Sequence, residues 1–112
     1  MKRGEIWTFA GGASYLGKPR PAVVLQSDAF DGTASVTICA LTSDPTEAPL
    51  VRLEVTPSET NGLHGPSRLM VDKISTVPRA RAGYRLGALD SVDMVRLERA
   101  VLVFLGMAGT VG

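Results

Sequence analysis

Short apolar segments separated by turn-forming residues recur about every ten residues through most of the chain, and this spacing limits the fold more than any other feature. Several of the segments alternate apolar and polar residues, which is typical of strands. We expect strands over residues 5–10, 22–26, 35–41, 50–55 and 68–71. The pattern predicts a mainly β fold, a small antiparallel barrel or sandwich, and not βαβ units.

The segment 11–28 begins as a glycine-rich loop and ends as a buried strand, and Arg20 lies where the two meet. Prolines flank Arg20, and a proline fixes its own φ and moves the preceding residue out of the helical region. Lys18 and Arg20 are therefore expected in extended backbone. A mobile loop followed by positively charged residues in rigid backbone is suited to a site that binds an anionic ligand. The alternative is that Arg20 is an ordinary solvated charge at the start of a strand.

The end of the chain has helical periodicity. Asp90 is the expected N-cap, Asp93 follows three residues later, and Gly106 is the expected C-cap. One stripe of apolar residues faces the sheet at helical spacing: Met94, Leu97, Val101, Phe104 and Leu105. Three further apolar residues fall outside this stripe and predict a homodimer, because they exceed what one contact needs: Val95, Leu102 and Val103.

The densest basic run contains Arg79, Arg81 and Arg85, which would share one face if residues 76–86 were extended. Two interpretations stay open at this point. The run contacts a nucleic acid, or it forms a solvated edge that discourages pairing between sheets.

Composition limits the function classes. A chain of 112 residues, 45% of them hydrophobic, is expected to form one domain over residues 1–112. The single cysteine, Cys39, and the single histidine, His64, cannot build a disulfide framework or a Cys/His zinc site in a monomer. We expect Cys39 to fill a buried strand position and His64 to lie on the surface. No apolar run has the length of a membrane span, so we expect a cytoplasmic protein with no membrane partner.

The sequence contains no P-loop, no dinucleotide-binding glycine motif and no His-Glu-x-x-His. Instead, cations and hydroxyls follow or precede the expected strands: Lys18, Arg20, Thr42, Ser43, Lys73, Ser75 and Thr76. The planar guanidinium of an arginine binds phosphate and stabilises negative charge that develops on phosphoryl oxygens. RNA cleavage needs few other groups, because the substrate carries its own nucleophile, the 2′-hydroxyl.

Segments spread over nearly the whole chain, in the right order, resemble the MazF/PemK family, the toxins of bacterial toxin–antitoxin pairs. They are residues 2–7, 17–25, 41–43, 71–77 and 86–90. The resemblance implies a dimer of SH3-like barrels, each with a C-terminal helix. It also implies an endoribonuclease that cuts single-stranded RNA without a metal or other cofactor, and an antitoxin partner whose acidic tail competes with RNA.

Within the resemblance, Arg20 matches the family's catalytic arginine and Thr42 its catalytic threonine. Further residues are expected to bind the RNA: Lys18, Tyr15, Ser43, Lys73, Thr76, Arg79 and Arg81. Two segments differ from many relatives, which have an acidic residue and glutamine at Tyr15-Leu16 and arginine at Ser75. The general base is therefore left open, and Tyr15 either stacks on an unpaired base or packs against the barrel.

Two other functions remain as alternatives. The CcdB toxins share the expected fold and poison gyrase through a Trp-Gly-Ile ending, whereas this chain ends Gly-Thr-Val-Gly. A non-catalytic SH3-like binding module would need an exposed aromatic groove, which few aromatic residues are present to form.

Overall fold

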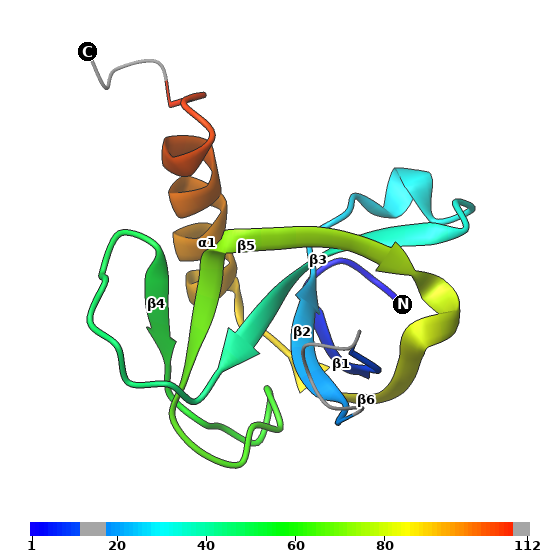
Figure 1. Ribbon diagram of the computed structural model, residues 1–112, viewed down its shortest axis with the longest axis horizontal. Helices are drawn as coiled ribbons and strands as arrows, with labels where there is room; N and C mark the ends of the chain where they lie inside the picture. The colour runs from blue at the N-terminus through cyan, green and yellow to red at the C-terminus, as the bar shows by residue number, and fades with distance from the viewer. Residues whose placement is uncertain (12–17, 109–112) are drawn as a thin grey trace.

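The computed structural model describes residues 1–11 and 18–108 (Figure 1). The described chain forms a mainly antiparallel β structure with a C-terminal helix, in the order β1 (Glu5–Phe9), β2 (Arg20–Val24), η2 (Asp28–Phe30), β3 (Ser35–Thr42), β4 (Arg52–Val55), β5 (Ser67–Pro78), η3 (Arg79–Arg81), β6 (Ala82–Ala88) and α1 (Ser91–Phe104). Here η marks a short 3-10 helix. The predicted fold class, an antiparallel β structure followed by a helix, is confirmed.

The strands form one curved sheet in the order β4-β5-β3-β2-β1-β6, with every neighbouring pair antiparallel. Backbone pairing does not close this sheet into a full barrel, since β4 and β6 are its two edges. The loop 56–66 spans the opening instead, and the Ala88 N–H donates to the Thr60 carbonyl at 2.9 Å. The loop therefore covers part of the β6 edge, where residues 60–62 pack against residues 86–88.

Both faces of the sheet are apolar, and β2 contributes to both. Val23 packs in the cluster that α1 covers, whereas Ala22 and Val24 pack in a second cluster on the opposite face. All three are 2% exposed or less. The prediction that this strand is buried on both faces is confirmed, and so is the prediction that Cys39 is buried.

Helix α1 begins and ends as the sequence predicts. The Asp90 carboxylate accepts from the Asp93 N–H at 2.8 Å, which satisfies an N–H that the helix leaves free. Gly106 has a φ of +72°, and its N–H donates to the Val103 carbonyl at 3.0 Å. Leu97, fully buried, joins α1 to the core. No helix in the described part of the chain is long and apolar enough to cross a membrane.

Residues 76–86 do not form one extended segment, so the condition under which the basic residues would share one face is not met. Strand β5 has twelve residues and extends well beyond 68–71, because it pairs with β3 as far as Ser35↔Pro78. The chain must then turn to reach β1, the strand that pairs with β6, and it does so through η3. The turn separates the basic residues. Arg79 donates to the Thr33 carbonyl, whereas Arg85 pairs with Glu5 at 3.0 Å.

Candidate functional site

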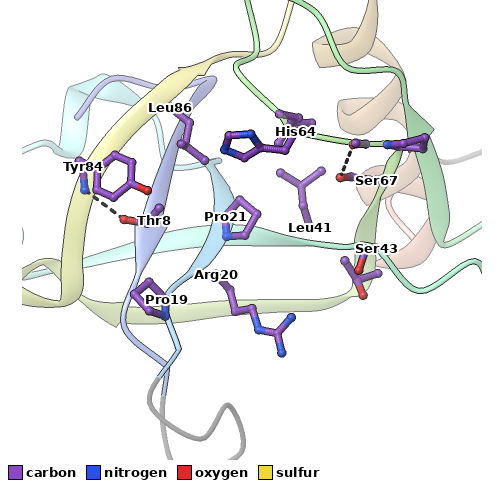
Figure 2. A pocket seen from close by; sticks show the side chains of 14 residues that line it. Thr8, Pro19, Arg20, Pro21, Leu41, Ser43, His64, Ser67, Tyr84 and Leu86 are labelled. Carbon is purple, nitrogen blue, oxygen red and sulfur yellow. Dashed lines mark hydrogen bonds between the residues drawn. The ribbon is translucent and has the colours of Figure 1, made fainter.

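Arg20 and Thr42 line one pocket of about 300 Å³ near the start of β2 (Figure 2). We call it the central pocket. Its wall comes from β1, β2, β3, β6 and the loop before β5, and is made of Thr8, Pro19, Arg20, Pro21, Leu41, Thr42, Ser43, Leu63, His64, Gly65, Pro66, Ser67, Tyr84 and Leu86. The two residues matched to the family's catalytic pair therefore share a cavity, and Ser43 lies beside them.

Strand register explains why Arg20 and Thr42 meet. Ala22 of β2 pairs with Ala40 of β3, and the strands are antiparallel. Two residues further along, the first residue of β2 and the last residue of β3 reach the same end of the sheet. Arg20 is exposed there, and Thr42 is half-buried. Burial of the apolar residues of β2 and β3 thus fixes the separation of two polar side chains.

The hydroxyl of Thr42 is oriented by the turn that follows it. The Asp44 N–H donates to Thr42 Oγ1 at 3.1 Å, so one lone pair of the hydroxyl is occupied and its hydrogen stays available to donate. The Asp44 carboxylate accepts from the Thr46 hydroxyl at 2.7 Å and from the Thr46 N–H at 3.0 Å. These hydrogen bonds, helped by nearby arginines, hold the pKa of Asp44 below its usual value. Asp44 therefore remains a carboxylate and is a weak base at neutral pH.

Arg68 holds the segment after Thr42 in place. Its guanidinium donates to the carbonyls of Pro45 and Thr46 and pairs with Glu54 at 2.7 Å. The Arg68 side chain is only 12% exposed, whereas that of Glu54 is 74% exposed. The turn that orients Thr42 is consequently attached to β4 and β5.

A second hollow of about 260 Å³ adjoins the central pocket and shares Arg20, Leu41 and Thr42 with it. We call it the basic depression, because it also contains Arg52 and Lys73. Arg52 forms two hydrogen bonds with Asp72, at 2.9 and 3.2 Å. The bond from Arg52 is the main reason that the pKa of Asp72 lies below its usual value. Lys73, which the sequence predicts to bind RNA, thus lines the same hollow as Arg20.

The other described residues expected to bind RNA lie outside the wall of the central pocket. Thr76 Oγ1 is 2.7 Å from Thr37 Oγ1, near α1 and not at the central pocket. Arg79 donates to carbonyls of the segment 30–33. Arg81 and Arg20 both line a small hollow of about 50 Å³. Lys18 is exposed two residues before Arg20, and Tyr15 lies outside the described residues.

Sequence reasoning missed two residues of the central pocket, His64 and Tyr84. His64 is exposed, as expected, but it lines the same pocket as Arg20. Tyr84, which no sequence pattern singled out, is 63% exposed. The sequence signal around His64 is only a run of turn-forming residues. The position of this loop depends on Gly62, which packs against the backbone of Leu86, a contact between distant parts of the chain.

No group of three or more His, Cys, Asp or Glu residues within residues 1–11 and 18–108 is arranged to hold a metal ion. Cys39 is fully buried, and burial raises the pKa of its thiol to about 12. Cys39 is therefore an inert core residue at neutral pH.

Comparison with known proteins gives a consistent result over the length of the chain. The family model of PemK-like, MazF-like toxins of type II toxin–antitoxin systems matches residues 2–105. A protein of Mycolicibacterium smegmatis named probable endoribonuclease MazF is 50% identical over 109 residues, which cover 97% of this chain and 100% of that protein.

Solved structures share the fold at lower identity. A mycobacterial endoribonuclease in complex with its cognate antitoxin superposes with a TM-score of 0.79 at 23% identity, covering 96% of each chain. The Mycobacterium tuberculosis toxin MazF-mt6 has a TM-score of 0.77 at 21% identity, covering 92% of this chain and 97% of that one. A MazE-MazF complex of Deinococcus radiodurans has a TM-score of 0.75 at 24% identity, covering 96% and 97%. These likenesses establish the fold.

Proposed function

The chain belongs to the PemK-like, MazF-like toxin family of type II toxin–antitoxin systems, and from this membership we propose that it cuts single-stranded RNA at the central pocket. The observation that carries the proposal is the meeting of Arg20 with an oriented Thr42 hydroxyl in one cavity. The neighbouring Arg52 and Lys73 favour a polyanionic substrate, since cations gathered along a groove attract a nucleic acid backbone. The net charge of only +1 makes this local grouping the source of affinity.

In the proposed reaction the 2′-hydroxyl of one nucleotide attacks the adjacent phosphorus and gives up its proton. A pentacoordinate phosphorane forms, the bond from phosphorus to the 5′-oxygen breaks, and that oxygen leaves with a proton. Arg20 stabilises the extra charge on the phosphoryl oxygens, and Thr42 donates to one of them and orients the phosphate. The products are a 2′,3′-cyclic phosphate and a free 5′-hydroxyl.

We propose that this reaction needs no metal ion, because protein cations stand where the phosphorane charge develops. Arg20, Arg52 and Lys73 line the basic depression around Thr42. An arginine stays protonated at neutral pH and offers a planar pair of donors to two phosphoryl oxygens. These groups support charge stabilisation of the kind that a divalent ion supplies in other nucleases.

The partners follow from the family and from the surface. As in other toxin–antitoxin pairs, a cognate antitoxin is the neutralising partner, and we propose that its acidic tail occupies the basic depression and competes with RNA. A homodimer is supported by α1, where Val95, Leu102 and Val103 are 41%, 43% and 46% exposed. The RNA then lies in a groove made by both subunits. We place the enzyme in the cytoplasm, where its substrate is found.

The deciding experiment incubates the purified protein with a long RNA in EDTA and identifies the fragment ends. We expect cleavage with 2′,3′-cyclic phosphate and 5′-hydroxyl ends. An RNA with one 2′-deoxy sugar at the cut position should resist cleavage there. A requirement for magnesium, or cleavage of the deoxy substrate, overturns the mechanism.

The same preparation tests the two other functions. Gyrase and supercoiled DNA are added in a parallel reaction, and accumulation of cleaved DNA with intact RNA would identify a gyrase poison. RNA binding without cleavage would identify a binding module.

A further inference from the structure

The central pocket has two chemically different halves. Arg20, Thr42 and Ser43 form a polar half, whereas the other half has an apolar floor with an aromatic ring on each side. Leu41 and Leu63 in this floor are 2% and 9% exposed. In Figure 2 the ring of Tyr84 enters from β6, and the imidazole of His64 enters from the opposite side, from the loop before β5.

Both rings stand on anchored backbone. The Tyr84 N–H donates to the hydroxyl of Thr8 at 3.1 Å, and Thr8 is 7% exposed. On the other side, Asn61 is 4% exposed and its side-chain oxygen accepts from the Leu63 N–H at 3.0 Å. Buried polar residues therefore hold the backbone on both sides of the opening.

This half of the pocket is poorly suited to phosphate or ribose, which need cations or several hydrogen-bonding groups. A flat unpaired base has the complementary chemistry, because aromatic side chains stack on its faces and an apolar floor contacts its edge. The volume of about 300 Å³ for the whole central pocket is at the lower end of small-molecule sites. The adjoining polar half lies where the phosphate of the same nucleotide would be held.

We propose that the slot between Tyr84 and His64 is a base-binding subsite for an unpaired nucleobase next to the scissile phosphate. This inference rests on the proposed RNA cleavage. With the base in the slot, the attached phosphate reaches Arg20 and Thr42. The following phosphate lies toward Arg52 and Lys73 in the basic depression. Because a base must leave its stack to enter the slot, the subsite also explains why the substrate is single-stranded.

The first test measures binding of a short RNA that cannot be cut because its scissile nucleotide carries a 2′-deoxy sugar. Tyr84→Ala should weaken binding roughly 10-fold, the size of one lost stacking contact, and Tyr84→Phe should bind nearly as the wild type does. Phe30→Ala is the matched control, since Phe30 is 62% exposed and is absent from the pocket wall. Equal losses for Phe30→Ala and Tyr84→Ala would overturn the proposal.

The second test replaces each nucleotide in turn by an abasic one. At one position beside the cut the wild type should lose roughly 10-fold in affinity, whereas Tyr84→Ala should lose almost nothing more, because its contact is already gone. If the losses in affinity caused by the abasic nucleotide and by Tyr84→Ala simply add at every position, the base does not enter this slot. That result leaves RNA cleavage itself standing, whereas a protein that neither binds nor cuts RNA disproves the proposed function.

His64 is tested by two substitutions. His64→Phe keeps a stacking ring and should bind the RNA more tightly than His64→Gln, whose affinity should fall several-fold below that of the wild type. Loss of the maximal rate in His64→Phe, with affinity unchanged, would show that the imidazole transfers protons and would remove it from the stacking subsite.

Discussion

The two ends of β2 and β3 differ in chemistry. At one end Arg20 begins β2 and Thr42 ends β3, and the surface there carries three cations, a hydroxyl and the carboxylate of Asp44. At the other end lies a groove of about 540 Å³ under α1, which we call the α1 groove; its aliphatic lining includes Leu25, Ile74, Val101, Leu102 and Leu105. The same two strands thus border the proposed cleavage site at one end and the proposed dimer surface at the other. Substitutions at the Arg20 end should therefore reduce cleavage and leave the dimer intact, whereas substitutions at the α1 end should weaken the dimer and, with it, the RNA groove that both subunits are proposed to make.

The largest effect should come from Arg20→Lys. Lysine keeps the charge but loses the two-pronged donor geometry, so we expect cleavage to fall roughly 100-fold or more. The dimer and the melting temperature should stay unchanged, because Arg20 is exposed. Single-turnover cleavage and light scattering check both points. The control is Arg99→Lys on α1, and near-native cleavage by Arg20→Ala would remove Arg20 from the mechanism.

Thr42→Ala should reduce cleavage by roughly 10- to 100-fold, since a hydrogen bond to a charged group contributes about 1.5–3 kcal/mol. Thr42→Ser keeps the hydroxyl that the Asp44 N–H orients and should retain most of the rate. Thermal unfolding of both variants provides the stability control. A Thr42→Ser variant as slow as Thr42→Ala would indicate that the methyl group, and not the hydroxyl, matters.

At the other end, Leu102→Asp should weaken the dimer roughly 10-fold or more, because it places a charge in an apolar contact. Leu102 is 43% exposed in the single chain, so folding itself should be little affected. Sedimentation at several micromolar concentrations measures the association. A variant that dimerises as the wild type does would show that α1 does not form the interface.

The smallest effect concerns pH. Because Arg52 lowers the pKa of Asp72 in the folded state, this carboxylate stabilises the fold above the ordinary aspartate value near 3.9 and loses that contribution as the pH falls through the folded value. The difference in melting temperature between wild type and Asp72→Asn should therefore be largest near pH 7 and shrink toward pH 3.

The comparison pair at the α1 groove is Arg3 with Glu98, at 2.8 Å. These side chains are 34% and 43% exposed, against 15% and 30% for Arg52 and Asp72. Glu98→Gln should change the melting temperature less, since solvent screens the more exposed pair. A larger shift in melting temperature for Glu98→Gln than for Asp72→Asn would contradict this expected order.

The sequence predicted what depends on local pattern. The caps of α1 at Asp90 and Gly106 and the two-sided burial of Val23 and its neighbours follow from spacing within a few residues. The meeting of Arg20 with Thr42 was predicted through the resemblance, and strand register explains it.

What the sequence did not predict depends on contacts between distant segments. The turn η3 exists because β5 ends beside Ser35 and the chain must then reach β1. His64 reaches the pocket because the loop 56–66, which joins β4 to β5, passes beside β6 on its way. There the Ala88 N–H donates to the Thr60 carbonyl. Neither arrangement leaves a periodic signal in the residues themselves.

The close packing of that loop on β6 has an evolutionary consequence. A Cβ at Gly62 would collide with the Leu86 carbonyl, and one at Gly87 with the Thr60 carbonyl, so both positions are restricted to glycine. Residues 64–66 lie just beyond this fixed point, and no Cβ-sized obstacle surrounds Gly65. Because the loop is fixed at Gly62 and has open space around Gly65, substitutions at residues 64–66 can alter the slot beside Tyr84 without changing the core. With the proposed base-binding subsite, we expect new RNA sequence preferences to arise by changes at very few codons.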